Sequence, residues 1–162
     1  NPTTGGGIAG AAYAGKYAGE QAVRAIGEGD VSEEALWHYN ERVMDHFGQR
    51  YAGLDVYNVL STAIDVNELM GLLARLPGEK LAEALYSGTT SFGPRLIAKT
   101  AKESYGFWSE IYKFYETKNA ADELMGHYGR YPRRPSAMEG WKDQRDRLME
   151  DVYEVTGADP KY

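Results

Sequence analysis

Cysteine is absent from this chain of 162 residues, and its absence removes several kinds of chemistry. Without a thiol, the segment has no disulfides, no thiolate metal sites and no cysteine nucleophile. Basic charge is also scarce, because 24 acidic residues outnumber 18 lysines and arginines and give a formal net charge of −6. Binding to phosphate backbones needs a basic surface, so we do not expect nucleic acid as a partner.

Long apolar runs and metal-ligand spacings are missing as well. The sequence holds no run of about 18 apolar residues, the length that predicts a membrane-spanning helix. The histidines His38, His46 and His127 show no spacing such as His-x-x-x-His, and we expect no metal site. Asp65 and Glu68 stand in an apolar stretch, but a solvated strip on a helix explains both. No residue is identified as a catalytic acid or base.

Apolar residues recur at helical spacing along most of the chain, and no stretch shows the period-two alternation of a strand. The sequence therefore predicts a mainly α fold. Ser32 is a good N-cap with acidic residues after it, and prolines and glycines mark other helix ends. The predicted helices cover residues 8–26, 33–51, 56–76, 79–86, 94–105, 108–117, 120–128 and 138–155, with a basic loop at 130–135.

The first predicted helix is rich in small residues. Gly10, Gly15 and Gly19 each cost about 1 kcal/mol of helix stability relative to alanine. Close approach of another backbone, most simply a neighbouring sheet, or of a ligand would compensate for this cost. Charged residues spaced four apart occupy another face and predict a ladder of exposed ion pairs, namely Lys16, Glu20, Arg24 and Glu28.

The segment before this helix carries a family resemblance. Residues 1–8 read Asn-Pro-Thr-Thr-Gly-Gly-Gly-Ile and lead directly into the small-residue helix. This motif resembles the last flavin-contacting motif of the p-hydroxybenzoate hydroxylase-like flavoproteins, and in this form it is most similar to the geranylgeranyl reductases. The continuation Gly-Glu-Gly-Asp-Val-Ser-Glu-Glu-Ala-Leu at 27–36 is also similar to that family. Together these stretches cover roughly a third of the chain.

The resemblance implies the helical C-terminal region of an FAD-dependent α/β oxidoreductase, truncated at its N-terminus. Residues 1–28 would be the last flavin-binding loop and helix of the FAD domain, and 29–162 a helical C-terminal domain. Main-chain groups at Gly5, Gly6, Gly7 and Ile8 would contact the flavin, and Pro2 would shape the loop. The positive end of the helix would favour reduced flavin. A simple glycine-rich turn before a helix is the alternative interpretation.

The same resemblance implies an activity and its partners. The whole protein would take electrons from a reduced donor through FAD and saturate double bonds in the geranylgeranyl chain of a membrane lipid or another prenyl compound. This chain alone is not expected to be a working enzyme, because the amino-terminal part of the FAD site would lie upstream. The expected location is the cytoplasm, with or without peripheral contact with a membrane.

Three features have one interpretation tied to this activity and one that is purely structural. The predicted helix 56–76 is apolar nearly all round and would line a tunnel for an isoprenoid chain or belong to the core. Arg130, Arg133 and Arg134 would meet lipid phosphates or satisfy helix carbonyls. The aromatic residues between Tyr105 and Tyr115 would form an interfacial belt or pack in the core.

Two other functions fit the sequence. One is a different flavoprotein of the same superfamily, such as a monooxygenase or an electron-transfer flavoprotein–quinone oxidoreductase. The other is a non-enzymatic helical interaction module, which predicts that the segment folds and stays monodisperse alone. A part of a larger enzyme predicts instead an exposed apolar stripe along residues 8–26.

Overall fold

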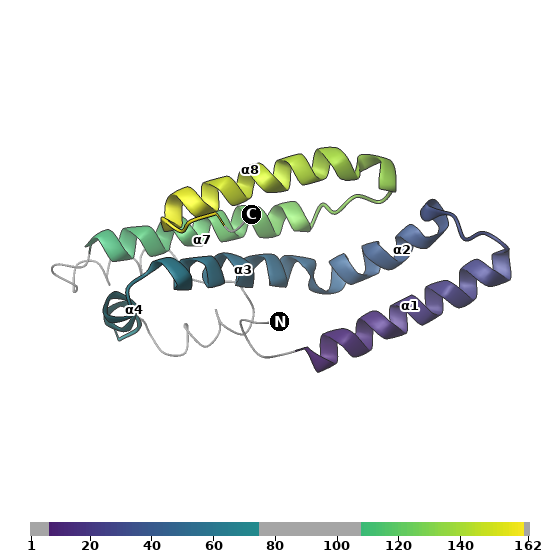
Figure 1. Cartoon of the computed structure of the whole chain (residues 1–162), viewed down its shortest axis with the longest axis horizontal. Helices are drawn as coiled ribbons and strands as arrows, with labels where there is room; N and C mark the ends of the chain where they lie inside the picture. Colours follow the sequence, from purple (N-terminus) through teal and green to yellow (C-terminus); the bar gives the residue numbers. More distant parts are fainter. Residues whose placement is uncertain (1–6, 75–107, 161–162) are drawn as a thin grey trace.

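Every regular element in the computed structural model is a helix, within residues 7–74 and 108–160, which are the residues that the structure describes (Figure 1). The predicted mainly α fold is thereby confirmed. The predicted helices 79–86 and 94–105 lie outside the described residues. The elements in chain order are α1 (Ile8–Glu28), α2 (Glu33–Val43), the π-helical turn η1 (Met44–Gly48), α3 (Gln49–Ala63), α4 (Val66–Leu73), α7 (Trp108–Tyr128), the short 3₁₀ helix η2 (Pro135–Ala137) and α8 (Met138–Thr156).

The helices lie side by side. α2, η1 and α3 follow one another without interruption and form one long rod through the middle of the molecule (Figure 1). α1 runs back along α2, while α7 packs against α3 and α8 packs against α7. This arrangement places α1 at one edge of the molecule and the α7–α8 pair at the other.

The turn between α1 and α2 follows from local sequence. Gly29 adopts a left-handed conformation with φ of 71°, which glycine reaches without steric cost. The next N–H, that of Asp30, bonds back to the carbonyl of Ala25 at 3.0 Å and closes the helix end. Ser32 then caps α2, because its Oγ accepts a hydrogen bond from the N–H of Ala35 at 3.2 Å. The predicted helix end and N-cap are both confirmed.

The main core lies between α3, α7 and α8. Small and branched apolar side chains from these three helices meet there, and each is almost fully removed from water. Burial of this kind is the dominant stabilising contribution to a helical fold. The buried members of this cluster are Ala52, Val56, Val59, Ala121, Leu124 and Val152.

A second, aromatic cluster fastens α2 to the α7–α8 connection. Trp37 stacks on Tyr131 with ring centroids 5.9 Å apart, and its Nε1–H donates to the carbonyl of Pro132 at 2.8 Å. His127 stacks on Trp141 at 4.6 Å, and its Nε2 bonds to the carbonyl of Trp141 at 3.0 Å. This ring cluster holds the α7–α8 connection against α2.

The predicted helix 56–76 and the predicted break near Tyr51 are wrong. The helix runs on through Gly53 and Leu54, both buried, and the burial outweighs the cost of about 1 kcal/mol for a glycine in a helix. The break comes instead at Ile64, whose backbone is extended, and at Asp65. The Asp65 carboxylate accepts the N–H of Asn67 at 2.8 Å and starts α4, which gives this acid a structural role.

The two helices predicted at 108–117 and 120–128 form one helix, α7. Thr117 is fully buried, and its hydroxyl donates to the carbonyl of Lys113 at 2.8 Å, so a residue with weak helix preference satisfies its polar group inside the helix. The final helix at 138–155 is confirmed as α8, which is followed by Gly157 in the left-handed conformation.

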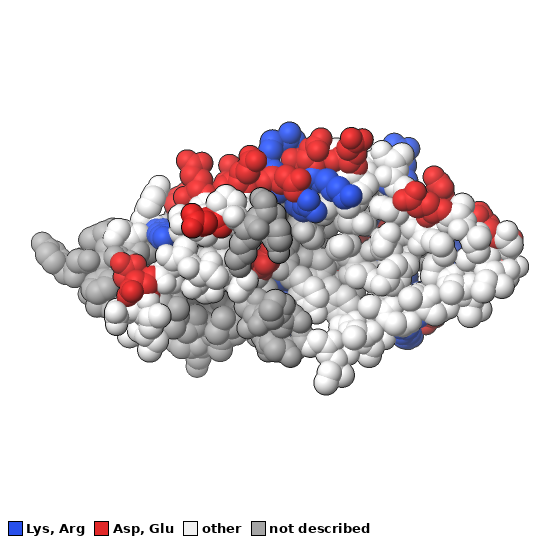
Figure 2. All heavy atoms as spheres, viewed as in Figure 1, with Lys and Arg blue, Asp and Glu red and all other residues white. Residues whose placement is uncertain are grey.

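One face of α1 is uncovered. Ile8, Val23 and Ile26 keep 90%, 74% and 74% of their surface exposed, and a Cβ at Gly15 or Gly19 would meet no atom within 4 Å. The close approach predicted for Gly15 and Gly19 is therefore not made by any described part of the chain. The exposed stripe predicted for a part of a larger protein is present, and Figure 2 shows the α1 side largely free of charge while charges gather over α8.

The predicted ladder of ion pairs on α1 is confirmed. Lys16 pairs with Glu20 at 3.8 Å and Arg24 with Glu28 at 3.0 Å. Glu20 also pairs with Arg42 of α2 at 2.7 Å, and this guanidinium lowers the pKa of the Glu20 carboxyl. Through Arg42 the ladder links α1 to α2. The charged residues of the ladder lie on this face of α1, and the opposite face is apolar.

Candidate functional site

The first turn of α1 carries the described part of the predicted flavin contacts. Of the residues predicted to contact flavin, the structure describes Gly7 and Ile8, while Pro2, Gly5 and Gly6 lie outside the described residues. Gly7 precedes the helix without a side-chain cap, and its carbonyl accepts the N–H of Ala11 at 2.8 Å. The first turn contains no acidic residue. The first N–H groups of the helix and its positive end thus meet no neutralising side chain in that turn.

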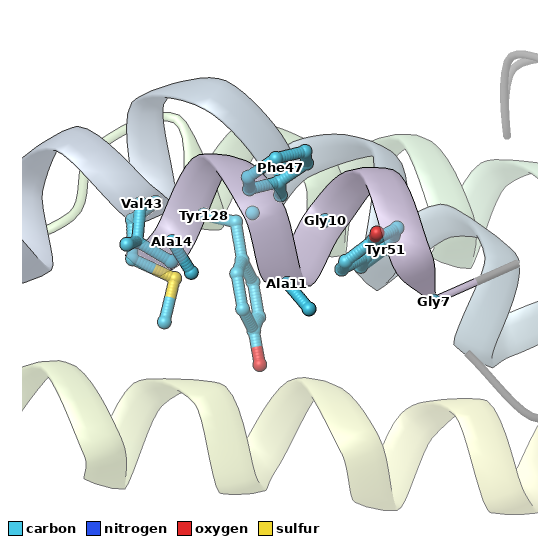
Figure 3. Close-up of a pocket in the computed structure, with 10 residues that line it drawn as sticks. Gly7, Gly10, Ala11, Ala14, Val43, Phe47, Tyr51 and Tyr128 are labelled. Carbon is cyan, nitrogen blue, oxygen red and sulfur yellow. The ribbon is translucent and has the colours of Figure 1, made fainter. Parts of the chain in front are cut away.

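An apolar pocket of about 360 Å³ adjoins this helix end (Figure 3). Its lining comes from the first two turns of α1, from the end of α2 with η1 and the start of α3, and from the end of α7. None of the described residues that line it is charged, and the hydroxyls of two tyrosines are the polar side-chain groups among them. The lining residues are Gly7, Gly10, Ala11, Ala14, Val43, Met44, Phe47, Gly48, Tyr51 and Tyr128.

Small residues and a π-helical turn make room for the pocket. η1 contributes Met44, Phe47 and Gly48, and π-helical turns inside α-helices occur frequently at functional sites. On the opposite wall, a Cβ at Gly10 would lie 3.0 Å from the hydroxyl of Tyr51. The missing side chain of Gly10 therefore lets the Tyr51 phenol lie directly over the first turns of α1.

A row of stacked rings holds one wall of the pocket in place. Phe47 stacks on Tyr51 with centroids 5.5 Å apart and on His46 at 4.2 Å. His46 Nδ1 and the hydroxyl of Tyr17 on α1 are 2.6 Å apart, and the guanidinium of Arg42 lies 4.0 Å from the Tyr17 ring. These contacts tie η1 to α1 and fix the direction of the Phe47 ring.

Tyr128 forms the part of the lining that comes from α7. Its ring meets Trp141 edge to face at 5.0 Å, which anchors the phenol to the aromatic cluster beneath. Burial raises the pKa of the Tyr128 hydroxyl, because the charged phenolate loses hydration there. The group therefore stays neutral at physiological pH and acts as a hydrogen-bond donor or acceptor only.

The basic loop at 130–135 connects α7 to α8, as predicted, but Arg133 does not satisfy helix carbonyls. Its guanidinium makes two hydrogen bonds to the Asp45 carboxylate, at 2.8 and 3.1 Å, and lies 3.7 Å from Glu41. The hydrogen bonds to Asp45 raise the pKa of Arg133. Its charge is compensated within the molecule, whereas Arg130 and Arg134 are exposed at the surface.

The histidines have structural surroundings. His127 is 2% exposed, and burial lowers its pKa, so the ring is held neutral with Nε2–H donating to Trp141. His38 lies 3.2 Å from Glu41 on the same helix. Within the described ranges, no group of three or more histidine, aspartate or glutamate residues could hold a metal ion. In those ranges, too, no helix is long and apolar enough to cross a membrane.

The sequence predicts the helix start at Gly7 and Ile8 but not the pocket. Met44, Phe47 and Tyr51 share one apolar face in the sequence pattern, which marks them as buried but does not say what they face. The missing information is that η1 is a π-turn and that α1 folds back over it. The weak signal available was the small size of Gly10, Ala11 and Ala14 on one helix.

Comparisons with known proteins give three relatives that share a description. The chain is 24% identical over 151 residues to the digeranylgeranylglycerophospholipid reductase of Sulfolobus acidocaldarius, a match that covers 92% of this chain and 33% of that protein. It is 33% identical over 106 residues to digeranylgeranylglycerophospholipid reductase 3 of Methanosphaera stadtmanae, covering 63% of the chain and 27% of the relative. Over 52 residues it is 50% identical to reductase 1 of Methanococcoides burtonii, covering 32% of the chain and 13% of the relative.

The chain spans about a third or less of the length of the curated relatives that it matches. No protein-family model matches the chain. The three relatives confirm the resemblance that was drawn from residues 1–8 and 27–36.

Proposed function

We propose that the complete protein is a member of the geranylgeranyl reductase family, an FAD-dependent oxidoreductase that saturates double bonds in the geranylgeranyl chains of membrane lipids. The observation that carries this proposal is the similarity over 92% of the chain to a digeranylgeranylglycerophospholipid reductase. The names of the relatives indicate an oxidoreductase family, and the lipid substrate is carried over from those names as part of the proposal.

The end of α1 supports the cofactor part of the proposal. Bound in its reduced form, FAD supplies the hydride for such a reaction. The residues present suit a flat, electron-rich ring, because Gly7 has no side chain and the first turn of α1 has neither a side-chain cap nor an acidic residue. Main-chain N–H groups there would stabilise negative charge on the reduced ring by about 1 kcal/mol.

The proposed partners are a prenylated lipid and a reduced electron donor, and the proposed setting is the cytoplasm with peripheral contact with a membrane. The exposed Arg130 and Arg134 support the contact, since each basic residue near an anionic surface contributes about 1 kcal/mol. Arg133 contributes less, because Asp45 compensates its charge. Attachment through this loop is therefore weak and reversible.

The test is made on the complete protein, expressed from the natural start of its gene. We expect it to purify with bound FAD, to lose its yellow colour on reduction and to saturate a geranylgeranyl lipid when an electron donor is supplied. Gly7→Ala should lower FAD affinity by about tenfold or more, since a methyl group would stand between backbone and ring. The φ of Gly7 is −144°, so alanine at this position avoids the left-handed conformation that only glycine adopts freely.

Gly27→Ala provides the matched control on the same helix. A Cβ at Gly27 meets no atom within 4 Å, and this variant should keep its FAD. A colourless complete protein that also fails to take up added FAD contradicts the proposal and favours the helical interaction module. Equal FAD content in both variants would remove Gly7 from the flavin contacts.

A further inference from the structure

The pocket beside α1 is chemically selective in what it can bind. Among the described residues, no lysine, arginine or acidic side chain lines it, so a phosphate headgroup inside it would lose hydration without a charged side chain as partner. A peptide segment would also be poorly held, because the described side chains of the lining offer its buried N–H and C=O groups no polar partner besides the hydroxyls of Tyr51 and Tyr128. A branched hydrocarbon chain has no polar groups to satisfy. The lining therefore favours a hydrocarbon over the other two occupants.

The size and position of the pocket agree with a hydrocarbon that reacts at this end of the helix. Its volume of about 360 Å³ lies within the range of about 300–1,000 Å³ found for small-molecule sites. Gly7 belongs both to the pocket lining and to the helix end proposed to meet the flavin ring. A molecule in the pocket would thus touch the same turn of α1 that the ring approaches.

We propose that this pocket binds a segment of the isoprenoid chain, with Ala14 setting how far the chain extends along α1. The proposal rests on the proposed function and specifies where its substrate is held. Figure 3 shows Gly7 and Tyr51 at one end of the pocket and Ala14 with Val43 at the other. A chain that enters beside Gly7 runs along the first two turns of the helix and ends against Ala14.

The aromatic wall suits this role. The Phe47 ring is fixed by stacking on Tyr51 and His46, so it presents a flat apolar surface to the chain. The phenols of Tyr51 and Tyr128 add rigid apolar area with few rotatable bonds. A rigid wall on one side and three residues without large side chains on the other, Gly10, Ala11 and Ala14, leave a slot along α1.

The experiment uses the complete, FAD-loaded protein and two probes of different length, geranylgeraniol and the shorter geraniol. Ala14→Leu fills the far end of the pocket, and Ala18→Leu makes the same change one turn further along α1, at an exposed residue outside the lining. Binding of each probe to the oxidised protein is measured by calorimetry, and FAD content is measured by absorbance.

We expect Ala14→Leu to raise the Kd for geranylgeraniol about tenfold or more, while the Kd for geraniol stays within about twofold of the unmodified protein. Ala18→Leu should change neither constant. Val43→Ala, which widens the same end, should leave geranylgeraniol binding intact. Weaker binding when this end is filled, together with unchanged binding when it is widened, separates an effect on the site from general misfolding, and unchanged FAD content in each variant confirms that the fold is kept.

Three results would overturn the assignment. One is an unchanged Kd for both probes in Ala14→Leu, and another is equal weakening by Ala14→Leu and Ala18→Leu. The third is a loss of FAD in Ala14→Leu alone, which would place part of the flavin in the pocket. Each of these differs from a failure of the proposed function, in which the unmodified protein binds no FAD and reduces no prenyl probe.

Discussion

The two edges of this molecule differ in how completely they are covered. At the α7–α8 edge, side chains from three helices enclose one another, and Leu124 and Val152 are 1% and 0% exposed. At the α1 edge, one side of the helix packs on α2 while the other leaves Val23 and Ile26 each 74% exposed. The first region has its own buried core. The outer apolar face of α1, in contrast, packs against no other part of the described chain.

This difference explains why the candidate site lies where it does. The pocket forms at the boundary between the two regions, where small residues of α1 meet the π-turn of the central rod. One wall is anchored to the aromatic cluster through Tyr128, and the other belongs to the sparsely packed helix. Segments that bind ligands are often drawn from the less densely packed parts of a fold, and α1 is such a part.

The largest expected effect comes from shortening one side chain in each of the two regions and comparing the losses of stability. Leu124→Ala should lower the free energy of unfolding of this chain by about 2–5 kcal/mol, because it leaves a cavity in the core. Val23→Ala should change it by no more than about 0.5 kcal/mol, since that side chain is already in water. Urea unfolding followed by circular dichroism measures both.

A loss from Val23→Ala as large as that from Leu124→Ala would contradict the comparison. It would mean that the exposed face of α1 is covered in solution by a second copy of the chain. Dependence of the unfolding midpoint on protein concentration would then reveal the association.

Local features of the sequence predict much of the fold. The end of α1 at Gly29 and the start of α2 at Ser32 depend on residues within one turn, and the structure has both where the sequence places them. The end of α8 at Gly157 belongs to the same class. Such signals operate through backbone conformation and short hydrogen bonds, which the chain carries with it wherever it folds.

Features that depend on distant residues were predicted poorly. The rod continues through Gly48, where a Cβ would lie 3.4 Å from the Tyr128 ring, a residue eighty positions away. The break at Ile64 and Asp65 is hidden inside an apolar run and had no turn signal of its own. For the site, Gly7 and Ile8 follow from the motif, but the pocket needs α1 and η1 to meet, which no local pattern specifies.

Protonation should also distinguish the two edges. His127 is buried in the aromatic cluster, and burial lowers its pKa below the unfolded value of 6.5. The unfolded chain therefore takes up a proton first, so stability is complete above about pH 6.5 and falls as the pH drops below it. The slope from this residue is at most about 1.4 kcal/mol per pH unit.

His127→Gln should reduce this slope between about pH 6.5 and 5, because the variant has no imidazole that the unfolded chain would protonate first. Unfolding free energies from urea titrations at several pH values make the measurement. An unaltered slope in His127→Gln would show that the ring is not held neutral in the folded chain, and that the acid sensitivity has its origin elsewhere.

The smallest expected effect comes from the glycines of α1. It tests whether the exposed apolar face of this helix is a packing surface in the complete protein. In this chain, Gly15→Ala and Gly19→Ala should each raise the free energy of unfolding by up to about 1 kcal/mol, because alanine favours the helix and a Cβ meets no atom within 4 Å. In the complete protein the same changes should lower stability if another part packs closely on this face. Thermal unfolding of the two forms makes the comparison. A gain of equal size in both would show that the face stays open in the complete protein, and the small residues would then have no packing role.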